Sequence, residues 1–115
     1  MRTLERNKSL LYLCEKYEDG ELIKYKKPEP YYENYTPTNT ESDLIGIGMT
    51  YPMYLRIKSD IINKDRYKPG DKVYVYVVPP EEYDELAEDC DYIVDEEPLK
   101  TINQVEIRLK RLSSD

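Results

Sequence analysis

Carboxylate side chains are concentrated in one short part of the chain. Residues 79–99 contain ten Asp or Glu and no Lys or Arg. Carboxylate oxygens are the ligands that Mg²⁺ and Ca²⁺ prefer, and paired carboxyl groups can transfer protons when one has a raised pKa. The run 88–97 has neither the spacing nor the glycine of a calcium loop, and nothing in it distinguishes an acid from a base. The sequence therefore predicts a solvated acidic segment with no metal site and no catalytic pair.

Other kinds of catalytic chemistry lack their usual residues. The chain has no His, which removes Ser-His and Cys-His nucleophiles and histidine metal ligation. Gly46 and Gly48 are not followed by the third glycine and the helix of a nucleotide-binding loop. These absences predict a protein that is not an enzyme and uses no cofactor. Cys14 and Cys90 form either two buried thiols or one disulfide, and the sequence leaves both alternatives open.

Lys and Arg side chains are concentrated elsewhere. Residues 44–78 hold six Lys or Arg against three Asp, although the chain of 115 residues carries a net charge of -7. A mildly basic core therefore carries an acidic insert. No apolar run is long enough to span a membrane, and the charged N-terminus lacks the apolar centre of a signal peptide. We therefore expect a cytoplasmic protein that does not enter a membrane.

The first 43 residues predict a β-hairpin followed by an extended arm. Over residues 9–27, Asp19-Gly20 supplies a tight turn between apolar flanks, with a helix through residues 10–17 as the alternative. Residues 28–43 contain three Pro and many small polar residues, which indicates an extended linker. The tyrosines of this arm either pack on the body or dock on a partner; they are Tyr31, Tyr32 and Tyr35.

The middle of the chain predicts a short helix and a strand. Ser59 or Asp60 can cap a helix over 59–65, and the turn Lys68-Pro69-Gly70-Asp71 leads into a strand over 72–78. That strand is apolar on both faces. One face carries valines and the other tyrosines: Val73, Val75 and Val77 against Tyr74 and Tyr76.

The acidic segment predicts an amphipathic helix. Pro80 suits a first helical position, and apolar residues then recur at helical spacing within 80–97. After this helix, a half-buried last strand is predicted because apolar and charged residues alternate from Val105 to Lys110. The apolar stripe of the predicted helix consists of Tyr83, Leu86, Ala87 and Cys90.

The segment YLRIKSDIINKDRYKPGDKVYVYV, residues 54–77, reads as a strand, one helical turn, a Pro-Gly-Asp turn and a second strand. It resembles the swapped-hairpin domain of the AbrB, SpoVT and MazE families, with the similarity covering residues 44–78 and a closing strand at 105–112. The positions that carry the resemblance are Leu55-Arg56-Ile57, Asp60-Ile61, Tyr67 and Lys68 to Val73, with Ile47-Gly48-Met49-Thr50 upstream. Three positions depart from the family pattern: Lys58, Arg66 and Met49-Thr50 replace a proline, a glycine and Asn-Ser.

The resemblance implies a mainly β fold with short helices. It would be an AbrB-like swapped-hairpin barrel intertwined between two copies of the chain, with residues 1–43 as an N-terminal hairpin extension. Residues 44–115 would form the AbrB-like domain, and residues 79–99 its acidic helical insert. The strand that is apolar on both faces would then pack against the partner chain. The family binds DNA through basic residues, and the matching positions here are Arg56, Lys58, Lys64, Arg66 and Lys68.

Two functions are consistent with these charges. The first is a non-enzymatic, homodimeric AbrB-like transcription regulator or antitoxin, whose basic face binds duplex DNA with a steep dependence on salt. The alternative is an acidic protein-interaction module or inhibitor, of the kind that viruses and plasmids encode, which binds a basic partner protein through residues 79–99. Its contact residues would be Tyr83, Leu86, Glu81, Glu82, Glu85 and Glu88.

Overall fold

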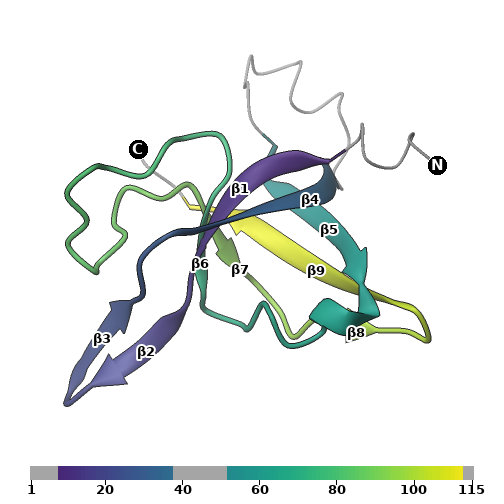
Figure 1. The fold of residues 1–115 in the computed structure, drawn as a ribbon, viewed down its shortest axis with the longest axis horizontal. Coiled ribbons are helices and arrows are strands. Elements are labelled where there is room, and N and C mark those ends of the chain that lie inside the picture. Colours follow the sequence, from purple (N-terminus) through teal and green to yellow (C-terminus); the bar gives the residue numbers. More distant parts are fainter. Residues whose placement is uncertain (1–7, 38–51, 113–115) are drawn as a thin grey trace.

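The computed structural model describes residues 8–37 and 52–112, which are mostly strands (Figure 1). The prediction of a mainly β fold is confirmed. The end of the expected arm, residues 38–43, and the Ile47–Thr50 match lie outside the described residues. The strands are β1 (Ser9–Cys14), β2 (Lys16–Asp19), β3 (Leu22–Tyr25), β4 (Glu29–Pro37), β5 (Tyr54–Asp60), β6 (Lys72–Tyr74), β7 (Tyr92–Val94), β8 (Leu99–Lys100) and β9 (Gln104–Arg111), with the 3-10 helix η1 (Ile61–Asn63) after β5.

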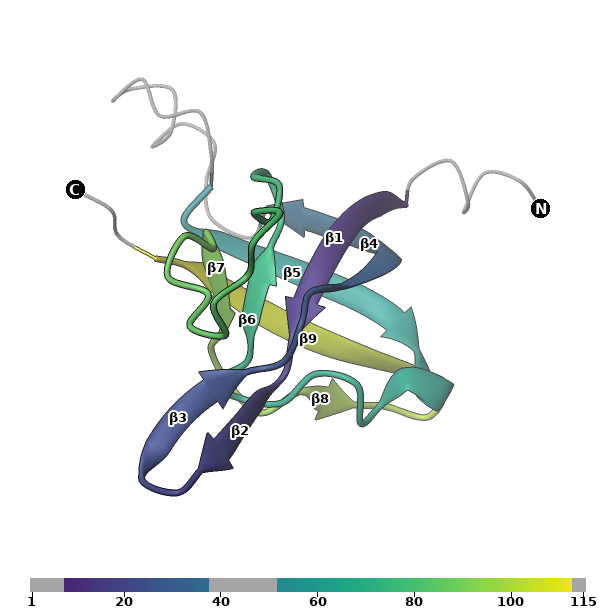
Figure 2. The ribbon, with the colours of Figure 1, turned by 60° about the vertical axis from the view of Figure 1, so that its left-hand side comes forward.

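The long strands close into one barrel. Their order is β5-β4-β1-β6-β7-β9, and β5 pairs again with β9, from Tyr54↔Lys110 to Asp60↔Gln104. Closure leaves these strands without an open sheet edge. A single chain supplies every strand of the barrel, including β1 and β4 from the first 43 residues (Figure 2).

Alternating side chains of the barrel strands fill a main core. Leu55 and Ile57 of β5 lie in register with Leu109 and Ile107 of β9, and all four are buried. The charged residues between them point outward, so the predicted half-buried last strand is confirmed. The main core consists of Leu11, Leu13, Leu55, Ile57, Tyr67, Val73, Val75, Tyr92, Val94, Val105, Ile107 and Leu109.

The predicted hairpin is present but shorter than expected. β2 and β3 pair from Lys16↔Tyr25 to Asp19↔Leu22. The turn between them has Gly20 at φ 68°, the left-handed value that a type II′ turn gives to a glycine at its first central position. β1 instead belongs to the barrel, where it pairs with β4 and β6, and the alternative helix over 10–17 is wrong.

The extended arm is also wrong over residues 29–37. These residues form β4, which lies between β1 and β5 in the barrel. Pro30 and Pro37 misled the prediction, because proline cannot donate to a ladder and usually marks a loop. Both prolines lie near the ends of the strand, where a missing N–H is tolerated. The tyrosines of this segment point in two directions: Tyr31 and Tyr35 pack on the main core, and Tyr32 is exposed.

The expectation of a strand buried on both faces holds for its first half. Val73 and Val75 face the main core, whereas Tyr74 lies in a separate second core with Cys14, Ala87 and Cys90. The strand ends at Tyr74 rather than at Val78, and Val77 and Val78 are exposed. The second face of β6 is thus covered by residues 83–90 of the same chain.

The predicted acidic helix is wrong. Residues 75–91 form an irregular segment, and residues 92–94 belong to β7. Glu85 and Ala87 have φ values of 71° and 50°, which no right-handed helix contains. The apolar stripe does identify buried residues, because Tyr83, Ala87 and Cys90 pack in the second core.

The short helix predicted over residues 59–65 is present only as η1, since Ser59 and Asp60 belong to β5, and the turn that follows it is confirmed. Asp60 caps η1 by accepting the N–H of Ile62 at 3.1 Å. Gly70 has φ 93°, and the N–H of Asp71 donates to the carbonyl of Lys68 at 3.0 Å. The glycine of the Pro-Gly-Asp turn is therefore required by its backbone conformation.

Candidate interaction surface

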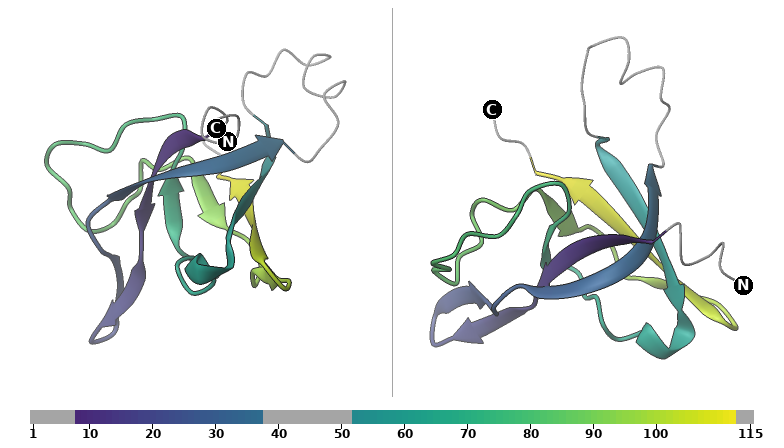
Figure 3. Two further views of the ribbon diagram at one scale, coloured as in Figure 1. Left: turned by 45° about the vertical axis from the view of Figure 1, so that its right-hand side comes forward. Right: turned by 45° about the horizontal axis from the view of Figure 1, so that its top comes forward.

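The acidic loop, defined here as residues 79–91, is held against the β2–β3 hairpin. The N–H of Tyr25 donates to the carbonyl of Glu85 at 2.8 Å, and the Tyr83 hydroxyl donates to the carbonyl of Tyr25 at 2.9 Å. Lys24 forms an ion pair with Glu85 at 3.4 Å. Figure 3 shows the hairpin and this loop projecting from the same side of the barrel.

Two acidic residues at the end of the loop are structural. Asp91 accepts the backbone N–H groups of Val75 and Tyr76, both at 2.8 Å, and Asp89 accepts the Tyr74 hydroxyl at 2.6 Å. Burial raises the pKa of the Asp91 carboxyl, and the two N–H donors oppose that rise. From the sequence, both residues are predicted to be solvated charges, because no local pattern indicates a hydrogen bond to β6.

The second core holds the loop through Ala87 and Cys90, which pack against Cys14 and Tyr74. Cys14 and Cys90 are both free and buried, so the two cysteines are thiols. Burial is the largest cause that raises the pKa of Cys14 to about 11 and that of Cys90 to about 12. Both thiols therefore remain protonated at neutral pH and act as packing groups.

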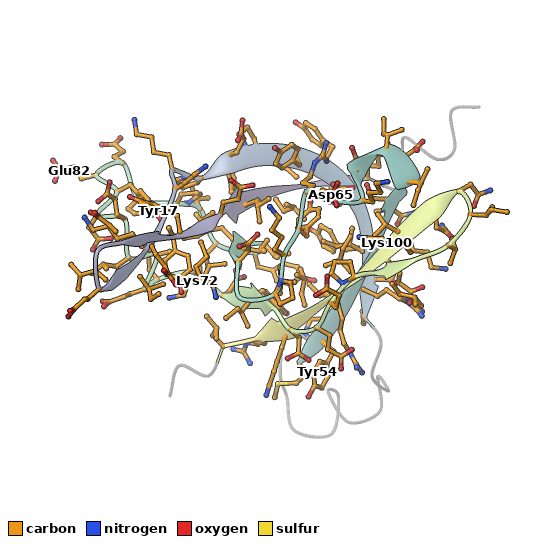
Figure 4. The ribbon with its side chains drawn as sticks, turned by 90° about the horizontal axis from the view of Figure 1, so that it is seen from below. Tyr17, Tyr54, Asp65, Lys72, Glu82 and Lys100 are labelled. Carbon is orange, nitrogen blue, oxygen red and sulfur yellow. The ribbon has the colours of Figure 1, made fainter. Side chains whose placement is uncertain are left out.

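Three carboxylates of the loop take no part in such contacts, whereas Asp84 accepts the N–H of Leu86 at 3.0 Å. Glu81, Glu82 and Glu88 are exposed and have no ion pair or side-chain hydrogen bond within residues 8–37 and 52–112. Figure 4 shows Glu82 at the outer margin of the molecule.

The predicted partner-binding set is therefore divided. Glu81, Glu82 and Glu88 are unpaired in the described part of the chain, whereas Glu85 is paired with Lys24. Tyr83 packs on the second core, and Leu86 is 41% exposed. The helical spacing that joined Tyr83 and Leu86 on one face has no counterpart in the structure.

The predicted DNA-binding cations are divided as well. Arg66 donates to Glu33 at 2.8 Å and to Asn63 at 3.0 Å, and its guanidinium lies over the ring of Tyr31 at 3.9 Å. Glu33 is 3% exposed and also accepts the Tyr67 hydroxyl at 2.8 Å. Arg66 therefore neutralises a buried carboxylate inside the fold.

The other predicted cations lie on the barrel surface. Arg56 donates to Glu106 at 3.2 Å, and its buried Nε has no partner among the described residues. Lys58, Lys64 and Lys68 are exposed and form no ion pair in the described part of the chain.

A second strand with outward-facing cations, β9, lies beside β5, and the sequence alone predicts no site on it. β9 brings Arg108 opposite Arg56 and Lys110 opposite Tyr54 on the outward face. Arg108 donates to Glu96 at 3.3 Å and lies over the Tyr54 ring at 5.0 Å, and Figure 4 shows Tyr54 at the edge of the molecule. The basic ladder is defined here as Arg56, Lys58, Arg108 and Lys110. The alternation of β9 indicates that Arg108 and Lys110 face outward, and its pairing with β5 is needed to place them beside Arg56 and Lys58.

No family model, curated protein or solved structure matches the chain. Among the described residues, no group of His, Cys, Asp or Glu is arranged to hold a metal ion. No helix in that part of the chain is long and apolar enough to cross a membrane. The geometry thus provides two charged surfaces: three carboxylates with no partner among the described residues, on an anchored loop, and a basic ladder on two paired strands, where Glu106 lies opposite Lys58.

Proposed function

We propose that this protein is an interaction module that binds a basic partner protein through its acidic loop. The observation that carries the proposal is the fixation of the loop by the hairpin, by β6 and by the second core, while Glu81, Glu82 and Glu88 have no partner among the described residues. The net charge of -7 favours encounter with a basic protein.

Anchoring supports affinity as well as encounter. A flexible segment loses conformational entropy when a partner orders it, at about 0.5–1.5 kcal/mol for each immobilised side chain plus the backbone cost. A loop already held by Tyr83, Glu85 and Asp91 has lost most of its backbone freedom in the free protein. The carboxylates are thereby presented in a fixed arrangement that a complementary set of Lys or Arg can recognise.

The proposal is tested by reversing the three free carboxylates. The variant E81K/E82K/E88K should lose a partner that the full-length wild-type chain retains in a pull-down from its source cells. Glu85 is left unchanged, because a lysine there would repel Lys24 and disturb the hairpin. The matched control is E29K/D95K/E97K, which reverses three exposed carboxylates outside the loop and the hairpin and makes the same change in net charge.

Loss of the partner in the loop variant alone supports the acidic loop as the binding surface. Equal loss in both variants means that only net charge matters. Retention in both means that the partner binds elsewhere. Either of the last two outcomes overturns the proposal. Circular dichroism of each variant confirms that the barrel is intact.

The basic ladder supports a second candidate function, binding to duplex DNA. Lys58 and Lys110 have no ion pair among the described residues, and antiparallel pairing aligns their strands over seven residue pairs. An AbrB-like regulator would bind DNA as an intertwined homodimer. Because one chain closes this barrel, a dimer here would join two complete barrels.

Duplex binding is tested with a labelled duplex across a salt series. Affinity should fall steeply with salt, and K58E/K110E should weaken it, whereas K27E should not. A flat salt dependence or no binding at low salt would exclude this function. Light scattering with and without the duplex tests the homodimer, and a monomer under both conditions would exclude it.

A further inference from the structure

A groove lies beside the acidic loop. It has a volume of about 290 Å³ and runs between the link from β3 to β4 and the residues that follow β6. The rings of Tyr12 and Tyr83 line it, and both also pack on the second core. This volume is just below the range of about 300–1,000 Å³ that is usual for small-molecule pockets. The groove therefore fits one or two side chains of a peptide better than a cofactor.

The walls of the groove are apolar and stiff. Pro28, Pro79 and Pro80 contribute wall surface without any backbone N–H. Val78 lines the groove and is 80% exposed, although valine is usually buried. The Tyr83 ring is fixed because its hydroxyl donates to the Tyr25 carbonyl at 2.9 Å. The groove is thus preformed, so a ligand would spend little entropy in ordering it.

The rim of the groove carries one charge on each wall. Glu81 lies on the side of the acidic loop, and Lys27 lies on the opposite side. Glu82 follows Glu81 and is also exposed. A cationic side chain of a ligand therefore meets complementary charge beside Glu81 and is repelled beside Lys27.

We propose that this groove binds an extended, proline-containing segment of the partner protein that carries Lys or Arg at one end. The inference rests on the proposed function and names the chemistry of the partner. Proline-rich segments are already extended in the polyproline II conformation, and they dock in grooves lined by aromatic side chains. The tyrosine rings and proline walls provide that lining, and Glu81 selects the basic end.

The probe for the test is a fluorescein-labelled peptide, Arg-Pro-Leu-Pro-Pro-Leu-Pro, titrated with the full-length chain and followed by anisotropy. A matched peptide has alanine in place of each proline. We expect the alanine peptide to bind at least about tenfold more weakly, because it must lose the conformational freedom that proline lacks. Equal affinity of the two peptides would overturn the proposal.

Two variants that each replace an exposed aliphatic side chain by aspartate test whether the peptide binds in the groove. V78D places a charge in the groove at an exposed position and should weaken peptide binding at least about tenfold, since an aspartate opposes apolar docking. I102D makes the matching change at a side chain that is 92% exposed in the turn between β8 and β9, and should leave binding unchanged. Wild-type affinity in V78D, or equal loss in both variants, would contradict the groove.

A charge exchange tests the orientation. E81K should weaken the arginine peptide and strengthen a peptide with glutamate in place of arginine. If the variant E81K/E82K/E88K loses the cellular partner while the proline peptide does not bind the wild type, the acidic loop stands as the binding surface and the groove fails. If the partner is retained and the peptide still depends on Val78, the proposed function fails.

Discussion

The Asp91 carboxylate accepts the backbone hydrogen bond of Val75 that a neighbouring strand would otherwise accept. It accepts the Val75 N–H at 2.8 Å, and the Tyr76 N–H at the same distance, at the point where β6 stops pairing with β1 and β7. One side chain from the end of the acidic loop thus continues the hydrogen bonding of β6 for two residues. This contact joins the position of the loop to the stability of the barrel.

Asp91→Ala should lower the free energy of unfolding by about 1–3 kcal/mol, because it leaves backbone donors without a partner and water can reach only some of them. Urea denaturation measures the change. Asp95→Ala is the matched control, since Asp95 is exposed and should change stability by no more than about 0.5 kcal/mol. An effect of Asp91→Ala as small as that of the control would contradict the role of Asp91.

Asp71 gives the fold a dependence on pH. Its carboxyl is almost fully buried and accepts the N–H groups of Lys16 at 3.0 Å and Lys68 at 3.1 Å. Burial raises the pKa of Asp71, and the two N–H donors oppose that rise. The folded chain therefore keeps this proton at pH values where the unfolded chain has lost it. The contribution of Asp71 to stability is full below the ordinary pKa of about 4 and falls as pH rises through the folded-state pKa.

The free energy of unfolding should therefore fall less between about pH 4 and about pH 7 in Asp71→Asn than in the wild type. Asparagine does not titrate, so the part of the decline that comes from Asp71 should disappear in the variant. Urea denaturation at steps of pH gives the two curves. Parallel curves for the wild type and the variant would show that Asp71 titrates alike in the folded and unfolded chain.

The two thiols should be unreactive in the folded protein. Cys14 and Cys90 are buried, and their raised pKa values of about 11 and about 12 leave almost no thiolate at neutral pH. A colorimetric disulfide reagent should therefore modify neither residue in buffer and both in denaturant. Rapid modification of the native protein would show that the second core opens. Unmodified residues after denaturation would instead indicate a disulfide.

The sequence predicts those features that depend on neighbouring residues. Gly20 and Gly70 identify turns because positive φ strongly favours glycine, and Asp60 identifies the start of η1 by its cap. Period-two alternation likewise identifies β9. Each of these features is set within a few residues of the chain, where the pattern can be read directly.

Features that depend on distant contacts were missed. Tyr83, Ala87 and Cys90 have helical spacing and are buried, yet the backbone between them is irregular. The hydrogen bonds from Tyr25 and to Asp91 replace helical ones, and their partners are far away in the sequence. β4 was missed for the same reason, since its pairing with β1 and β5 outweighs the local preference of its prolines.

The position of Arg66 also follows from a distant contact, because Glu33 lies on β4. The resemblance to DNA-binding barrels assigns Arg66 to a nucleic-acid surface, whereas its guanidinium is held by Glu33, Asn63 and the Tyr31 ring. Removing one member of a buried ion pair leaves the other charge without compensation.

Arg66→Ala should lower the free energy of unfolding by about 3 kcal/mol, at the low end for a buried pair because the Arg66 side chain is partly exposed. Arg66→Lys should cost less, since it keeps the charge but loses the fork and the stacking on Tyr31. In a Glu33→Gln background, Arg66→Ala should cost clearly less, because no buried carboxylate remains to be neutralised. The double-mutant cycle is measured by urea denaturation. An equal cost in both backgrounds would mean that Arg66 acts through Asn63 and Tyr31 alone.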